Sequence, residues 1–146
     1  MPRKESALAA NQAEQRRLRA EQRAAEAPVR AGRRPLADAV RKAASVVERW
    51  QLKVAEELQG QAFGFGGWRL EEHERSLANA ERTLQSRLTD LRVYDAAHNI
   101  EADYTVPVLD REAVTRDALA EKQQRLAELR AKHEPHKEPN HEPPSA

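Results

Sequence analysis

The sequence predicts an all-α protein: an antiparallel helical hairpin, or coiled-coil-like bundle, with flanking helices and a disordered tail. Ala, Glu, Lys, Leu and Arg make up about 57% of the 146 residues, a composition typical of long helices when it is periodic. Large apolar residues recur every seven positions in two stretches, and a glycine-rich segment separates them. Leu, Ile, Val and Phe together are only about 18% of the chain, which disfavours an ordinary compact core.

Residues 1–35 are interpreted as a basic, Ala/Arg-rich helical arm and linker, with nine Lys and Arg against four Glu. A helix is expected over about 6–27. Its two large apolar residues, Leu8 and Leu18, are ten positions apart and fall on different faces, so this helix is marginal by itself. Three residues are then expected to break it: Pro28, Gly32 and Pro35.

Residues 36–94 are interpreted as the hairpin. Valines repeat every seven residues in its first half, and leucines do so in its second half, as in the seam of a coiled coil. The two predicted helices, 36–58 and 68–92, would each be roughly 35 Å long and so match in length. The predicted interaction core consists of Val40, Val47, Trp50, Val54, Leu70, Leu77, Leu84 and Leu91.

The tip of the hairpin, residues 60–68, combines glycines with a cluster of aromatic residues. The glycines allow the chain to reverse. Because a helix precedes this loop and no Lys accompanies it, a phosphate-binding glycine loop is disfavoured. The aromatic side chains either tuck over the end of the bundle, which we favour, or form a patch for a partner: Phe63, Phe65 and Trp68.

Beyond the hairpin, residues 95–109 are expected to form an extended linker because they are β-branched and contain Pro107. Asp110 can cap a C-terminal helix over 110–132. Residues 133–146 are rich in His and Pro and lack large apolar side chains, which predicts disorder. Histidines in this tail could chelate a metal weakly, but a solubilising tail is favoured and no metal site is predicted.

The composition also disfavours several classes of function. The chain has no Cys and no nucleophile, base and acid that spacing would bring together, so we expect neither catalysis nor a cofactor. No run approaches the 18 apolar residues of a membrane span, and the first residues lack the apolar segment of a secretory signal. A cytoplasmic protein without membrane contact is the expectation.

The favoured function is a non-catalytic interaction or adaptor protein that self-associates, or docks on a helical partner, through its heptad stripes. Trp50 is too large for one facing helix to cover. We therefore expect a third helix. It could come from residues 111–132 of the same chain or from a second copy, and we favour a second copy, which would complete a four-helix bundle.

The alternative is a nucleic-acid-binding accessory factor, in which the arm contacts phosphates and the hairpin oligomerises. The candidate phosphate-binding residues are Arg16, Arg17, Arg19 and Arg23. Against this, no aromatic residue is interleaved for base stacking, and interspersed glutamates allow the helix to be merely solvated.

Overall fold

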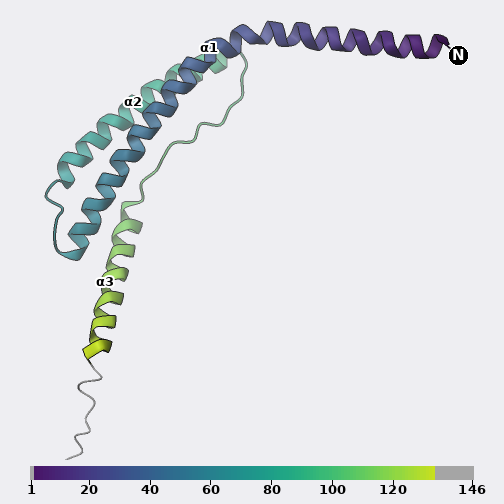
Figure 1. Ribbon diagram of the computed structural model, residues 1–146. Coiled ribbons are helices and arrows are strands. Elements are labelled where there is room, and N and C mark those ends of the chain that lie inside the picture. The colour runs from purple at the N-terminus through teal and green to yellow at the C-terminus, as the bar shows by residue number, and fades with distance from the viewer. Residues whose placement is uncertain (1, 134–146) are drawn as a thin grey trace, which may run out of the picture. The chain divides into compact units, whose positions relative to one another are not determined.

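The computed structural model describes residues 2–133, and these residues form three helices and no strand (Figure 1). Helix α1 spans Pro2–Phe63, α2 spans Leu70–Ala97 and α3 spans Arg111–His133. The predicted all-α class is confirmed. The tail predicted to be disordered lies outside the described residues apart from His133, which ends α3.

The chain divides into two compact units, and α1 and α2 each contribute to both. The first unit is Met1–Ser45 with Glu81–Val106, and the second is Val46–Ala80 with Pro107–Ala146. In each unit a length of α1 packs antiparallel to a length of α2, which is the predicted helical hairpin.

The core of each unit is made by the heptad positions. Val47 and Val54 are fully buried in the second unit, together with Leu77 at 1% exposure. In the first unit the buried leucines are Leu84, Leu88 and Leu91. The remaining predicted core residues are only half-buried: Val40, Trp50 and Leu70. Small residues complete the seams where the two helices approach, and these are Ala43 and Ala80.

Helix α1 continues through the stretch where the sequence predicts a break, which corrects the expected separation of arm and hairpin. All three expected breakers lie inside the helix: Pro28, Gly32 and Pro35. A proline inside a helix removes a backbone hydrogen bond and costs roughly 3 kcal/mol. Two contacts from α2 hold this stretch, because Tyr94 donates to the Val29 carbonyl and Asp95 binds Arg33. Tertiary contacts of this kind override a local preference.

The C-terminus of α2 and the N-terminus of α3 are both capped. Asn99 has a φ of 54°, and the Ile100 N–H donates to the Asp95 carbonyl at 2.8 Å. A residue in the left-handed region followed by such a bond is a common helix C-terminus. The linker therefore begins at residue 98, three residues later than expected. At its other end the Asp110 carboxylate accepts the Ala113 N–H at 3.0 Å, which confirms the predicted N-cap of α3.

Candidate functional site

A buried carboxylate joins three segments of the first unit. The Asp95 side chain is 1% exposed. Arg33 donates a hydrogen bond to each of its carboxylate oxygens, at 2.8 Å from Nε and 3.1 Å from an Nη. The Tyr104 hydroxyl donates to the second carboxylate oxygen at 2.5 Å. The guanidinium of Arg92 lies 5.1 Å from the centre of the Tyr104 ring. The cluster thus ties the linker to α1 and α2; we call Arg33, Asp95 and Tyr104 the latch.

The charges and hydrogen bonds of the latch favour a structural role over acid–base catalysis. Hydrogen bonds from the Arg33 guanidinium lower the pKa of Asp95 against the opposing effect of burial, so the group stays anionic. The bond to this carboxylate raises the pKa of the Tyr104 hydroxyl, which stays protonated. An anion already occupied by three donors is a poor general base, because its proton affinity is low.

Beside the latch, Tyr94 lies across α1 at Gly32. Its hydroxyl donates to the Val29 carbonyl at 2.6 Å, and its ring centre lies 4.3 Å from that of His98. A Cβ on residue 32 would lie 2.5 Å from the Tyr94 hydroxyl oxygen and 3.2 Å from Cζ. The glycine is therefore what allows the phenol to reach the backbone of the helix.

This contact predicts that substitutions of Gly32 and Tyr94 have non-additive effects on the free energy of unfolding. Ala is favoured over Gly inside a helix by about 1 kcal/mol, but in the parent chain the new methyl displaces a phenol whose hydrogen bond contributes about 1 kcal/mol. Gly32→Ala should therefore change the free energy of unfolding little in the parent and stabilise a Tyr94→Leu chain by about 1 kcal/mol. Urea denaturation of the four proteins measures this coupling, and equal effects in both backgrounds would contradict the contact.

Neither the latch nor this contact was among the predicted site residues. Gly32 within an Ala- and Arg-rich stretch suggested a helix break, although a glycine also marks a close approach. Asp95 was placed at the start of the linker, where a carboxylate is normally exposed. Its pairing with Arg33 joins positions 62 apart in the chain, which no local pattern indicates.

Much of the arm is an exposed length of α1. Every residue from 6 to 25 is exposed. Three of the four candidate phosphate-binding residues are spaced three and four apart and so share one face: Arg16, Arg19 and Arg23. Arg17 lies off this face, with its Nε 3.9 Å from a carboxylate oxygen of Glu21. The face continues about two turns further to Arg30, which pairs with Glu26 at 2.8 Å.

At the tip of the hairpin the loop has a defined conformation. Gly64, Gly66 and Gly67 have φ values of 89°, 85° and 88°, which other residues rarely adopt. The Gly67 N–H donates to the Glu57 carboxylate at 2.9 Å. The favoured tucking of the aromatic residues is wrong for two of them, since Phe65 is 69% and Trp68 81% exposed.

Trp50, the residue from which a second copy was inferred, is partly covered by its own chain. Its ring centre lies 5.7 Å from that of His73, and the Lys53 ammonium lies 4.7 Å from it. His73 Nδ1 is buried without a hydrogen bond, and it lies 3.9 Å from a carboxylate oxygen of Glu57. The tryptophan therefore gives no reason to require a second copy.

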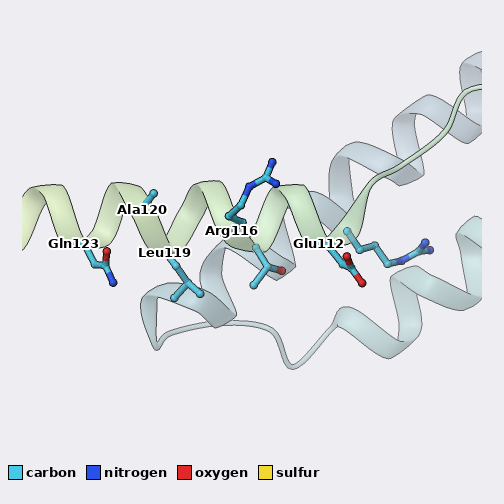
Figure 2. Close-up of a pocket in the computed structure, with 7 residues that line it drawn as sticks. Glu112, Arg116, Leu119, Ala120 and Gln123 are labelled. Atoms are coloured by element: carbon cyan, nitrogen blue, oxygen red, sulfur yellow. The ribbon is translucent and has the colours of Figure 1, made fainter.

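Helix α3 carries an apolar face whose leucines stay about half exposed. Leu119 and Leu126 are 44% exposed and Leu129 is 52% exposed. They are spaced seven and three apart, so they lie on one side of the helix. Figure 2 shows a shallow hollow at the first of these leucines, and every residue that lines it belongs to α3. Because a single helix forms this hollow, no second element of the described chain closes it.

Two kinds of site are not found in the described part of the chain. No group of three or more His, Cys, Asp or Glu residues is placed to hold a metal ion. No helix there has the length and apolar character needed to cross a bilayer.

The chain matches no protein-family model, no curated protein and no solved structure. Its function is therefore inferred from its own surfaces.

Proposed function

We propose that the protein is a non-catalytic helical interaction protein of the cytoplasm, which binds a protein partner through the exposed leucines of α3. The supporting observation is the face formed by Leu119, Leu126 and Leu129. Singly scattered apolar side chains are common on protein surfaces, but leucines gathered on one helix face are typical of an interface. Helices that dock in this way present apolar anchors three, four and seven residues apart.

The heptad stripes have a different role from the one expected of them. Val47, Val54, Leu77 and Leu84 are buried within the hairpin, at 1% exposure or less. A side chain that is covered by its own chain is not available to a partner. The proposal therefore moves the interface from the hairpin seam to α3, whose only buried residue is Ala118.

Site-specific photo-crosslinking in cells that produce the protein naturally tests this function. A photoreactive residue in place of Leu126 should capture a discrete protein adduct, identified by mass spectrometry as another protein or a second copy. The control carries the same residue at Glu128, which lies two positions on and so on the opposite face. The proposal fails if position 126 gives no adduct, or gives the same adducts as position 128.

A second candidate function, binding of a nucleic acid through the arm, is supported by the sidedness of its charge. Arg16, Arg19 and Arg23 share one face of an exposed helix, while Glu14 and Glu21 lie on the opposite face. A helix of this length with no packed face is marginal alone and would be ordered by a polyanion. Release of counterions from the phosphates would drive the binding.

Duplex binding by a charge-neutralised arm tests this candidate. Replacing Arg16, Arg19 and Arg23 by Gln should weaken binding of all sequences alike and flatten the log–log salt dependence by about 0.9 per lost phosphate contact. The control makes the same change of charge at three exposed arginines of the hairpin: Arg49, Arg82 and Arg87. Equal weakening by both sets would point to net charge alone, and no binding at low salt would remove the candidate.

A further inference from the structure

The leucine face of α3 is held in a defined position by contacts within the second unit. Arg111 binds both carboxylate oxygens of Glu74, at 2.8 and 2.7 Å, at the start of the helix. Further along, the Arg125 guanidinium lies 5.3 Å from the centre of the Phe63 ring. Lys122 donates to a carbonyl of α1 at 3.4 Å. Helix α3 is thus held against the hairpin. Lys122 lies three positions after Leu119 and four before Leu126, so the leucines lie beside this contact and keep only their outer parts exposed.

The charged residues that flank the leucine face of α3 are positive over most of its length. Arg116 and Arg130 flank the leucines in a column of positions seven apart, with Gln123 between them. Arg116 and Leu119 both line the hollow, and in Figure 2 their side chains leave α3 in different directions. The acidic residues of the same stretch are two positions away from the leucines and so point away from them: Asp117, Glu121 and Glu128. Asp117 forms an exposed ion pair with the neighbouring Arg116, at 3.6 Å. Within α3 only Glu112, in the first turn, departs from the pattern.

This charge distribution disfavours a second copy as the occupant. In an antiparallel pair the flanking columns would face each other, which places Arg116 opposite Arg130 of the other copy at both ends. In a parallel pair the column would meet the other flanking column of α3, in which two of the three residues are basic: Ala118, Arg125 and Lys132. Like charges at these flanking positions select against a pairing.

The chain's own last segment is also unsuited to cover the face. Residues 134–146 contain three Glu but no large apolar side chain. Three half-exposed leucines need apolar atoms against them, because the gain from burial is proportional to the apolar area removed from water. The occupant must therefore combine an apolar seam with negative flanks.

We propose that the leucine face of α3 binds an acidic amphipathic helix of another protein, with leucine-like residues in its seam and carboxylates beside them. Arg116 and Arg130 are separated by 14 positions, about 21 Å along the helix. The partner therefore carries carboxylates about two heptads apart on the flank that meets them. This inference rests on the proposed function and names its partner.

Peptide titration of the full chain tests the inference. The probe is a three-heptad helical peptide with Leu in its seam and Glu at its flanks, and its twins carry Lys or Gln in place of Glu. Fluorescence anisotropy should give about tenfold tighter binding of the Glu peptide than of the Lys twin, because two contacts change from attraction to repulsion. The difference should shrink at high salt.

Variants of the protein assign the effect to the face. Arg116→Glu with Arg130→Glu should reverse the preference, so that the Lys twin binds more tightly. The control, Arg82→Glu with Arg87→Glu on exposed positions of α2, makes the same change of charge and should leave the preference unchanged. Leu126→Gln with Leu129→Gln should abolish binding of all three peptides, and circular dichroism checks that this variant keeps its helices.

The other results separate this inference from the proposed function. Equal binding of the three peptides, lost in the leucine variant, would overturn the acidic partner and leave the interaction face standing. Crosslinking of the face to a second copy, with no peptide bound, would do the same. Peptide binding that persists in the leucine variant, together with the absence of an adduct from position 126, would overturn both.

Discussion

Replacing Asp95 by Asn should lower the free energy of unfolding by about 3 kcal/mol, because it leaves Arg33 without its counter-charge. Removing one partner of a buried ion pair typically costs 3–5 kcal/mol. We expect the lower end, since the Arg33 side chain is 30% exposed and keeps contact with water. The amide also places N–H donors beside donors of Arg33 and Tyr104. Urea denaturation followed by circular dichroism measures the loss.

Two further variants test whether the loss of stability comes from the latch itself. Asp90→Asn removes a carboxylate from an exposed position of the same helix and should change stability by less than about 0.5 kcal/mol. Arg33→Lys keeps the charge but loses the two-pronged hydrogen bond, so an intermediate loss is expected. An Asp95→Asn chain as stable as the Asp90→Asn chain would show that the carboxylate is not enclosed as described.

The pH dependence of stability follows from the same group. The pKa of Asp95 is lower in the folded chain than in the unfolded chain, so unfolding takes up a proton when the pH falls. Its contribution is complete above the unfolded value of about 4 and is lost as the pH falls through the folded value. Glu74 acts in the same direction, because hydrogen bonds from Arg111 lower its pKa. Asp95→Asn should therefore flatten the acid loss of stability without abolishing it.

Periodicity made the hairpin predictable, whereas the latch depended on contacts between distant parts of the chain. The leucine and valine repeats identify the seam because a seven-residue period keeps the same face of a helix turned inward. Pro28 and Pro35 misled the analysis, since their cost is local and the contacts that offset it come from α2. Asp110 was predictable because an N-cap uses only its own neighbours.

The surfaces were harder to predict than the core, for a related reason. The patchy leucines of α3 indicate a helix, but only the contacts of this helix with the hairpin show how much of each leucine stays exposed. Likewise, two aromatic residues of the tip, Phe65 and Trp68, remain exposed although their composition favours burial. Which apolar side chains remain exposed is decided by the packing of the whole unit.

Leu84→Asp should leave the chain largely unfolded at 25 °C, which is the largest effect expected of a single substitution. Leu84 is 1% exposed, and truncation of such a leucine to Ala alone costs 2–5 kcal/mol. A carboxylate in its place adds the penalty of an unpaired buried charge, several kcal/mol more. Single domains are stable by only about 5–15 kcal/mol, so the sum consumes most or all of that margin.

A substitution on the same helix separates burial from the chemistry of Asp. Val93 is 65% exposed, and Val93→Asp should cost less than about 1 kcal/mol. Leu84→Ala serves if the Asp chain is too unstable to purify, because its expected loss of 2–5 kcal/mol is measurable by urea denaturation. Equal stability of the Leu84→Asp and Val93→Asp chains would mean that the leucine repeat does not line the seam. The antiparallel packing of α1 and α2 would then lose the apolar residues that the repeat places in the seam, since Leu77 and Leu91 follow from the same repeat.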